Sequence, residues 1–429
     1  MLDIKAIRED PEPFRRGLAR RALADAVDQL LAADERRRSL TARVEQLRAE
    51  QNRLGKEIGA AQGEEKQRLI AQVSTVSAEL RQLEPQLEEA ERATTDLLAA
   101  TPNVPHESSP DGFTDEDAVE LRRSGEPPRF SFEPKDHAEL GARLGVLDTE
   151  RGARTSGSRF VYLLGDIAFV QFALVRHALD VMGDRGFVPV IPPVLVREEA
   201  MYGTGFLPTD AVNIYTTEQD DLYLVGTSEV PLAAFHMGEI LDETDLPVRY
   251  GGYSTCFRRE AGSYGKDLGG MFRVHQFDKV EMFSFTTPET SWDEHELILA
   301  IEEEIVGNLE LPYRVVNIAA GDLGGSAAKK YDIEVWLPGQ DRYRELTSCS
   351  NCTDYQARRL QTRLRRGSGT VEAVHTLNGT ATAVGRTLIA ILENHQQADG
   401  TVVLPRVLHP YLPERVRELT PPTRPRGDA

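Results

Sequence analysis

The sequence has 429 residues, and its 50 Lys and Arg residues stand against 69 Asp and Glu residues, a formal net charge of −19. Hydrophobic residues make up 40% of the chain, which excludes a wholly disordered protein, and no apolar run approaches the roughly 20 residues of a membrane-spanning helix. Three cysteines cannot form a disulfide framework, and the acidic opening segment lacks the apolar stretch of a secretory signal, so we expect a cytoplasmic location. The net charge disfavours a uniformly basic nucleic-acid binder, but charge acts locally, over roughly 8–10 Å, so nucleic acid is not excluded.

An apolar heptad repeat occupies much of the first hundred residues. Two stretches rich in helix-forming residues carry it, separated by a glycine-containing interruption at 59–63. The repeating positions include Leu40, Leu47, Leu54, Leu69, Val76 and Leu83. Two heptad helices joined by a short turn predict an antiparallel coiled-coil arm over about residues 27–98, on the order of 50 Å long. We expect a local bend at Pro85, because proline removes a helical hydrogen bond.

The first helix of this arm is basic. Between Arg36 and Lys56, seven basic residues stand against two acids, a local excess of five positive charges, although the second helix is acidic. The arginines of this stretch are Arg36, Arg37, Arg38, Arg43, Arg48 and Arg53. By themselves these residues favour a solvated surface with ion pairs between the helices; the alternative is a surface that contacts a phosphate backbone.

The composition changes after the arm. Residues 106–130 are rich in proline, serine, glycine and acids, which predicts a linker between an N-terminal domain, 1–105, and a second domain, 131–415. The helices and strands expected in the second domain lie at 167–182, 187–191, 222–225, 279–285, 292–308 and 331–336. We interpret this domain as α+β, built around a mostly antiparallel sheet, and expect 416–429 to form a flexible tail.

Polar side chains interrupt several of the strand-like runs. Alternate residues of a strand share a face, so we expect Arg258 and Glu260 to point the same way, and Thr227 and Glu229 likewise. The same alternation groups Phe277, Lys279, Glu281 and Phe283. For each pair an exposed face or a structural ion pair is the plain alternative. Together they predict a site for a ligand with both signs of charge, because buried charges are costly unless paired or used.

Two further segments bear on chemistry. The stretch 261–270 contains four glycines, which predicts a flexible hairpin loop over a substrate. Cys349 and Cys352 have the spacing of metal ligands, but a closed zinc site needs four ligands and the chain has no second such pair. We therefore expect no zinc and ordinary buried thiols. The chain also has no phosphate-binding loop of the G-x-x-x-x-G-K-[ST] type and no G-x-S-x-G elbow.

Six segments of the chain resemble conserved motifs of the class II aminoacyl-tRNA synthetases, and their residues are most similar to those of the bacterial seryl-tRNA synthetase family. The segment 185–193 resembles motif 1, 256–263 with 271–282 resembles motif 2, and 383–387 with 391–400 resembles motif 3. The remaining matches are 227–229, similar to the family's serine-binding signature, 345–351 and 354–359. The heptad arm fits the same family, so the resemblance covers nearly the whole chain.

This resemblance implies a serine–tRNA ligase. Serine carboxylate attacks the α-phosphate of ATP to give seryl-adenylate and pyrophosphate, and the seryl group then passes to the 3′ end of tRNA(Ser). The nucleophile is already an anion, so catalysis reduces to positioning and charge neutralisation. The catalytic residues implied are Arg258, Arg386 and Glu345.

The resemblance also implies the contacts of ATP. The ATP-binding set is Arg258, Arg259, Glu260, Val274, Phe277, Glu345, Leu346, Thr347, Ser348 and Arg386. Within it, Arg258 bridges the α-phosphate and the serine carboxylate, Arg386 lies by the γ-phosphate, and Phe277 stacks on adenine. Glu260 and the backbone of Val274 read the adenine edge. Glu345 and Ser348 hold Mg²⁺, which prefers hard oxygen ligands.

For serine, the implied binding set is Thr227, Ser228, Glu229, Arg258, Glu281 and Thr380. Thr227 and Glu229 lie near the ammonium group, and Glu281 accepts from the hydroxyl with the help of Thr380. A site built to hydrogen-bond a hydroxyl rejects alanine, because its polar groups would be left unpaired. Thr380 stands where serine is frequent in the family, and its extra methyl group narrows the site.

The arm and motif 1 imply partners. In this family the arm reaches the long variable arm of tRNA(Ser), and the implied contacts are Arg36, Arg37, Arg43, Arg48 and Arg53. Neutralising Arg36, Arg37 and Arg43 is expected to weaken tRNA binding and leave adenylate formation intact. Motif 1 implies a homodimer. Acceptance of tRNA(Sec) is left open.

Two alternatives remain at the level of sequence. A relative of the same fold that loads a carrier protein would lack the long arm, which this chain has. A non-catalytic coiled-coil adaptor would have lost its site residues, whereas Arg258, Glu260, Glu281, Glu345 and Arg386 are all present.

Overall fold

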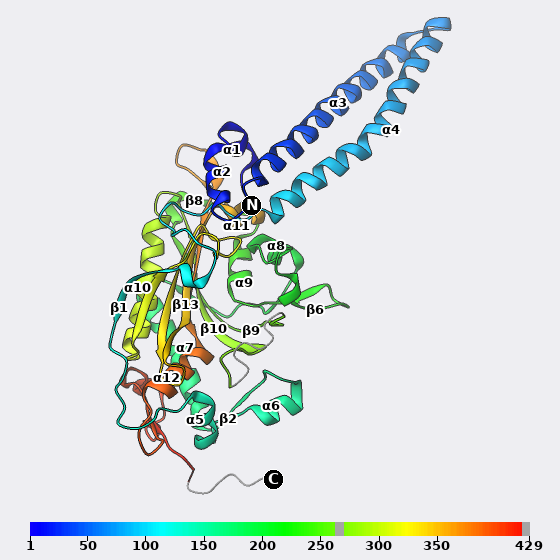
Figure 1. The fold of residues 1–429 in the computed structure, drawn as a ribbon. Coiled ribbons are helices and arrows are strands. Elements are labelled where there is room, and N and C mark those ends of the chain that lie inside the picture. Colours follow the sequence, from blue (N-terminus) through cyan, green and yellow to red (C-terminus); the bar gives the residue numbers. More distant parts are fainter. Residues whose placement is uncertain (262–269, 423–429) are drawn as a thin grey trace. The chain divides into compact units, whose positions relative to one another are not determined.

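The computed structural model describes residues 1–261 and 270–422 (Figure 1). The chain divides into two compact units, Met1–Val104 and Pro105–Ala429. The loop predicted at 261–270 falls almost wholly outside the described residues.

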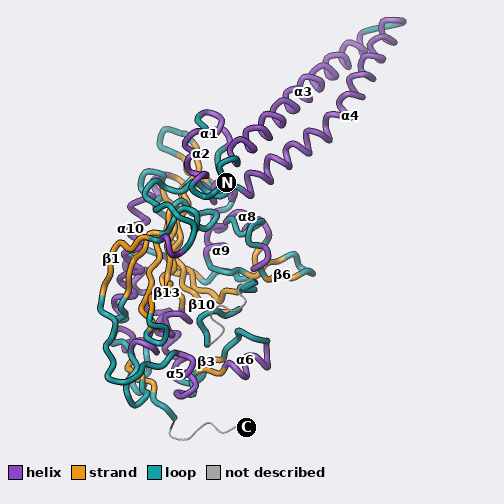
Figure 2. The backbone as a smooth tube through the Cα atoms, in the orientation of Figure 1, coloured by secondary structure: helices purple, strands orange, loops and turns teal. Residues whose placement is uncertain are grey.

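The first unit is helical. It comprises α1 (Ile4–Glu9), α2 (Glu12–Ala19), α3 (Ala26–Ala60) and α4 (Gly63–Ala100). Figure 2 shows α3 and α4 running side by side and meeting at one turn, which confirms the antiparallel coiled-coil arm. Its buried seam follows the predicted heptads and consists of Val44, Leu47, Leu54, Leu69, Val76 and Leu80.

Pro85 lies inside α4, and the helix continues through it. Its side chain is exposed, on the face of α4 opposite the buried seam. The missing N–H therefore deprives a carbonyl group on the solvent side, where water can replace the lost bond. This placement explains why a proline is accommodated in the middle of a 38-residue helix.

A buried carboxylate joins the base of the arm to α1. Asp34 of α3 is fully buried and accepts hydrogen bonds from Arg8 at 2.8 Å and from Arg37 at 2.6 Å. Burial alone would raise the pKa of Asp34, but the two guanidinium groups outweigh it and the pKa is lowered. Arg37 is thus committed to a structural ion pair.

The second unit is built on an eight-stranded sheet in the order β1-β11-β12-β13-β16-β10-β9-β4. The strands in that order are Val119–Ser124, Tyr313–Asn317, Lys329–Leu337, Arg342–Thr353, His375–Ala383, Gln276–Thr286, Val248–Phe257 and Val188–Val190. Every neighbouring pair is antiparallel except β4 and β9, which are parallel. This confirms the α+β prediction.

Helices cover both faces of this sheet. On one face, α7 (Asp166–Asp184), α10 (Ser291–Asn308) and α12 (Val384–Asn394) pack together over the central strands and enclose the main hydrophobic core. On the other face, the short helices α8 (Glu198–Thr204), α9 (Glu229–Ala233) and α11 (Tyr355–Leu360) form a smaller cluster. None of the helices in the described ranges combines the length and the apolar character that crossing a membrane requires.

Smaller elements complete the unit. The remaining helices are α5 (His137–Leu144) and α6 (Thr149–Ser156), with short 3-10 turns Asp115–Asp117, Ala211–Asn213, Ala234–His236, Glu243–Asp245 and Arg406–Tyr411. The strands outside the main sheet are β2 (Leu147–Asp148), β3 (Tyr162–Leu163), β5 (Leu195–Val196), β6 (Tyr215–Thr217), β7 (Leu222–Leu224), β8 (Ile240–Asp242), β14 (Arg363–Arg365), β15 (Val371–Ala373), β17 (Val402–Val403) and β18 (Glu418–Leu419). All three cysteines are buried.

Two segments differ from their prediction. The expected linker, 106–130, contains β1, which pairs with β11 as an edge strand of the main sheet. All six residues of β1 are exposed, so the strand carries the polar composition that predicted a linker. The expected tail, 416–429, begins with buried Val416 and with β18, which pairs with β17.

Candidate active site

One cavity of about 140 Å³ gathers most of the predicted substrate residues. It lies where β9, β10, β13 and β16 meet the beginning of α12. The predicted residues that line it are Arg258, Glu260, Val274, Phe277, Glu345, Leu346, Thr347, Ser348, Thr380 and Arg386. These residues come from segments more than a hundred positions apart, and the sheet order brings them to one place.

Arg258 is held in a defined orientation. It directly follows the last residue of β9, and its Nε donates to the carbonyl oxygen of Gly226 at 3.2 Å. Its guanidinium carbon lies 5.3 Å from the ring centre of Phe277. A cation held in this way needs little reordering to meet an anionic ligand.

Arg386 and Glu345 form a second charged pair in the cavity. Arg386, in the first turn of α12, donates from Nη1 to the backbone oxygen of Glu345 at 3.0 Å and to its carboxylate at 3.2 Å. The pKa of Glu345 is lowered to about 2, because Arg386 and Lys330 outweigh the opposing effect of burial. Glu345 is therefore ionised throughout the neutral pH range, as an oxygen ligand for a metal ion must be.

Two buried acids lie beyond the wall of this cavity. Glu281 forms an ion pair with Lys279 at 2.5 Å on the same strand, and the hydroxyl of Thr380 on the neighbouring strand donates to its carboxylate at 3.4 Å. Glu229 accepts from Gln356 at 2.8 Å and from Asn378 at 3.0 Å. Burial raises the pKa of Glu229 to about 7, and the neighbouring charge of Glu281 adds to this effect.

The strand-face argument is wrong for two of the predicted pairs. Thr227 lies in a turn and Glu229 is the first residue of α9, and the Thr227 hydroxyl accepts from the Glu229 backbone at 3.1 Å. β9 ends at Phe257, so Arg258 and Glu260 follow the strand, and Glu260 has a positive φ of 51°. The apolar runs in the sequence identified buried segments of the chain. These buried segments extend beyond the ends of the strands, so the alternation of a strand does not apply to every residue in them.

Five predicted residues do not line the cavity: Glu229, Glu281 and Thr227, described above, and Ser228 and Arg259. The hydroxyl of Ser228 lies 2.7 Å from that of Ser254 and is buried there. The guanidinium carbon of Arg259 lies 5.6 Å from the ring centre of Tyr215.

The sequence reasoning missed several lining residues. Arg273 lines the cavity and forms an ion pair with Glu260. Met271 and Phe272 also line it, and the ring of Phe272 has the guanidinium carbons of Arg386 at 4.8 Å and Arg344 at 4.1 Å. Arg273 could have been found from the sequence, because it is a basic residue four positions before Phe277, the ring predicted to stack on adenine.

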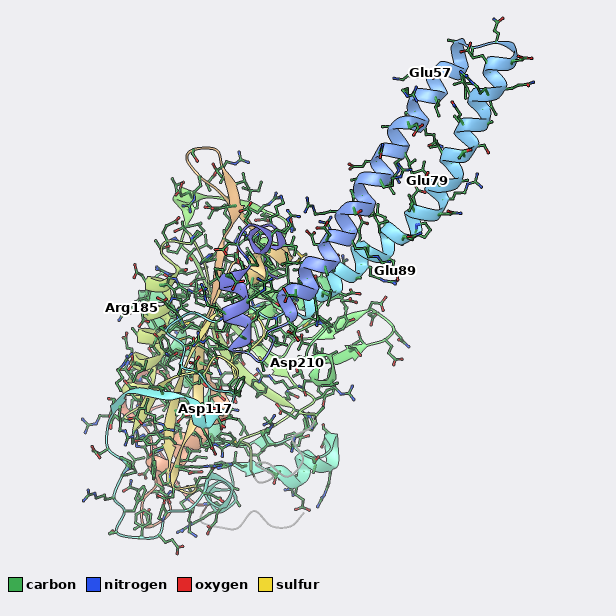
Figure 3. All side chains as sticks on the ribbon, turned by 45° about the horizontal axis from the view of Figure 1, so that its top comes forward. Glu57, Glu79, Glu89, Asp117, Arg185 and Asp210 are labelled. Atoms are coloured by element: carbon green, nitrogen blue, oxygen red, sulfur yellow. The ribbon has the colours of Figure 1, made fainter. Side chains whose placement is uncertain are left out.

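The five arm arginines that were predicted to contact tRNA are all engaged in ion pairs. Figure 3 labels three of the carboxylates along the arm. The pairs are Arg36–Glu89 at 3.7 Å, Arg37–Asp34 at 2.6 Å, Arg43–Glu79 at 2.5 Å, Arg48–Glu84 at 2.8 Å and Arg53–Glu57 at 2.7 Å. The structure therefore shows the ion-paired surface that the residues by themselves favoured, three of its pairs joining α3 to α4.

Comparison with known proteins agrees with this geometry. A family model for the class II tRNA synthetase core domain (G, H, P, S and T) matches residues 213–395, and one for the seryl-tRNA synthetase N-terminal domain matches residues 1–105. The fold around the antiparallel sheet is that of a class II aminoacyl-tRNA synthetase.

Close relatives give the family within that class. The chain is 54% identical to the serine–tRNA ligase of Acidothermus cellulolyticus, over 96% of this chain and 98% of that protein. It resembles the crystal structure of seryl-tRNA synthetase from Pyrococcus horikoshii complexed with ATP, with 44% identity, a TM-score of 0.91 and coverage of 98% and 100%. The cytoplasmic serine–tRNA ligase of Naegleria fowleri in complex with AMP is 36% identical, with a TM-score of 0.86 and coverage of 98% and 99%. The chain belongs to the seryl-tRNA synthetase family, whose members are ligases that form aminoacyl-tRNA.

Proposed function

We propose that this chain activates L-serine with ATP and transfers it to tRNA(Ser) through the residues described above. The observation that supports this proposal is that three kinds of charged group lie together at the cavity. Arg258 and Arg386 supply cations in the cavity, Glu345 supplies an ionised carboxylate, and Glu229 and Glu281 supply buried acids just beyond it. An amino acid and a nucleoside triphosphate together present the complementary charges.

The arginines carry the first chemical step. Serine carboxylate attacks the α-phosphorus, and the bond to the bridging oxygen of pyrophosphate breaks. Arg258 meets the carboxylate and the α-phosphate, while Arg386 and Arg273 neutralise the negative charge that collects on the leaving pyrophosphate. Phe277, already beside Arg258, offers a ring for adenine to stack on.

The buried acids select serine. Glu229 accepts from the ammonium group, since its hydrogen-bond partners Gln356 and Asn378 are neutral and it gains a cationic partner that Glu281 already has in Lys279. Glu281, fixed by Lys279 and Thr380, accepts from the substrate hydroxyl. Alanine would leave Glu281 without a partner, and the Thr380 methyl group reduces the space available to threonine.

Mg²⁺ fits one part of the cavity. Glu345 and Ser348 offer hard oxygen atoms beside the arginine that faces the phosphates, and the low pKa of Glu345 keeps its carboxylate available. Mg²⁺ bound there would neutralise phosphate charge. Replacement of Glu345 by glutamine should raise the Mg²⁺ concentration needed for activity.

The arm binds the tRNA, and the ion pairs indicate which cations do so most readily. In the described part of the arm, exposed Arg38, Arg81 and Arg92 have no carboxylate partner, so they meet a phosphate without breaking a contact. Exposed ion pairs contribute only about 0–1 kcal/mol, so Arg43 and Arg48 can exchange a carboxylate for a phosphate at small cost. Replacing Arg38, Arg81 and Arg92 by glutamine should weaken tRNA binding and its salt dependence, with adenylate formation unchanged. Equal loss of both activities would contradict this separation.

The edge of the sheet at β4 fits a second copy of the chain. Ile191 is 87% exposed, and Val188 and Phe172 are 55% and 63% exposed, close to an unpaired edge strand. Such residues mark an interface. We therefore propose a homodimer in the cytoplasm, with 1–105 as its tRNA-binding domain and 131–415 as its catalytic domain; tRNA(Sec) is a second acceptor to test.

The decisive experiment is amino-acid-dependent exchange between ATP and pyrophosphate, with serine, threonine, alanine and glycine compared, followed by transfer to total tRNA. Exchange with serine and transfer to tRNA are expected. Exchange without transfer would indicate a carrier-protein acceptor, and a folded protein without any exchange would overturn the proposal.

A further inference from the structure

A buried histidine outside the substrate cavity contacts two segments that contribute residues to that cavity. His137, at the first position of α5, is almost fully buried. Its Nδ1 lies 2.9 Å from Oε1 of Glu393, on the last turn of α12, and its own backbone N–H donates to the same oxygen at 3.0 Å. The other carboxylate oxygen of Glu393 accepts from the backbone of Gly339 at 2.9 Å.

The far side of the imidazole faces the segment that precedes β10. The backbone N–H of Met271 donates to His137 Nε2 at 3.2 Å. A backbone N–H can only donate, so Nε2 must present its lone pair. The ring proton therefore sits on Nδ1, which donates it to Glu393, and a single tautomer satisfies both contacts. The fit is tight, because a Cβ atom on Gly270 would lie 2.0 Å from Nε2.

The contact at Met271 bears directly on the cavity. Met271 and Phe272 both line it, and the Phe272 ring has the guanidinium carbon of Arg386 at 4.8 Å. Arg386 and Glu393 are seven residues apart on α12, two helical turns, so they share a face of that helix. His137 is thus tied at one nitrogen to the helix that bears Arg386 and at the other to the segment on which Arg386 stacks.

We infer that His137 is a positioning residue for ATP, which acts by fixing Met271 and Phe272 relative to Arg386. This inference rests on the proposed function, since it concerns the proposed ATP site. It assigns His137 no contact with substrate. Loss of its acceptor nitrogen would leave the buried N–H of Met271 unsatisfied and free this segment to move away from Arg386.

Two variants of His137 distinguish a role in positioning Met271 through a hydrogen bond from a role in filling space in the core. The amide of His137→Gln reaches the Nε2 position and can still accept from Met271, whereas the amide of His137→Asn reaches only the Nδ1 position and can still donate to Glu393. In serine-dependent exchange, His137→Asn should raise the KM for ATP about tenfold or more and change the KM for serine less than threefold. His137→Gln should stay within about threefold for both. His177→Asn, at another buried histidine, is the matched control and should leave both KM values unchanged.

Direct readouts keep the inference independent of turnover. Calorimetric binding of ATP to each variant should follow the KM values. Long-range ¹H–¹⁵N spectra of histidine-labelled protein should show the Nδ1-protonated tautomer of His137, and Glu393→Gln should weaken that preference and raise the KM for ATP. Equal effects of the asparagine and glutamine variants, parallel changes in both KM values, or an Nε2-protonated tautomer would overturn the inference. Absence of serine-dependent exchange in the unaltered protein would instead count against the proposed function.

Discussion

Replacement of Glu229 by glutamine tests the serine site, because it should weaken serine binding and at the same time stabilise the substrate-free protein. Glu229 is buried among Gln356 and Asn378 with Glu281 near it, and these surroundings raise its pKa to about 7. Ammonium binding needs the ionised acid. In the wild type, kcat/KM for serine should therefore rise about tenfold between pH 6 and a plateau near pH 8, because about a tenth of Glu229 is ionised one unit below its pKa.

The same pKa acts on stability with the opposite sign. A carboxyl group whose pKa rises from 4.5 to about 7 on folding holds its proton more tightly in the folded state. Its contribution to stability is fully present below pH 4.5 and is lost as the pH rises through 7. The shift of about 2.5 units corresponds to about 3 kcal/mol, so Glu229→Gln should stabilise the substrate-free protein by up to about 3 kcal/mol at pH 8 and have little effect near pH 4.5.

The assays are serine-dependent pyrophosphate exchange from pH 6 to 8 and urea unfolding without serine at pH 4.5 and pH 8. Glu229→Gln should lose the pH dependence and raise the KM for serine about 10- to 100-fold, as expected for a lost charge-assisted hydrogen bond. The exposed Glu218→Gln is the matched control, with no change in either assay. A flat wild-type profile, or a Glu229→Gln variant that binds serine normally, would refute this account of the site.

Three other changes have expected outcomes. Pro85→Ala should raise the stability of the arm by about 1–3 kcal/mol, because it restores a helical hydrogen bond on an exposed face, and unchanged or lower thermal stability would contradict the account of α4. Asp34→Asn should destabilise the first unit by about 3 kcal/mol, because it leaves Arg8 and Arg37 beside a buried neutral group; a urea midpoint equal to that of the wild type would count against it. Glu345→Gln should raise the Mg²⁺ requirement of exchange, and in the wild type this requirement should not vary between pH 5 and 8, since the pKa of Glu345 is about 2. A requirement that rises steeply below pH 6 would place the metal elsewhere.

The sequence alone determined the arm and the fold class. Heptad spacing indicates directly which face of a helix is buried, and this local period correctly placed Leu47 and Leu54 of α3 and Leu69 and Val76 of α4 in the buried seam. The resemblance to the family's motifs also grouped Arg258, Glu345 and Arg386, and the structure places all three around one cavity. An edge strand escaped detection, since every residue of β1 is exposed and its composition is that of a loop.

Only the tertiary structure decided how each charge is used. The sequence shows that Arg37 and Arg43 are basic, but their carboxylate partners Asp34 and Glu79 depend on helix packing. Likewise, Glu229 and Glu345 are identical in type, yet burial raises the pKa of one to about 7 and neighbouring cations lower that of the other to about 2. A side chain's identity is encoded locally, whereas its solvation and the charges around it depend on residues far apart in the chain, so these properties emerge only when the sheet has assembled.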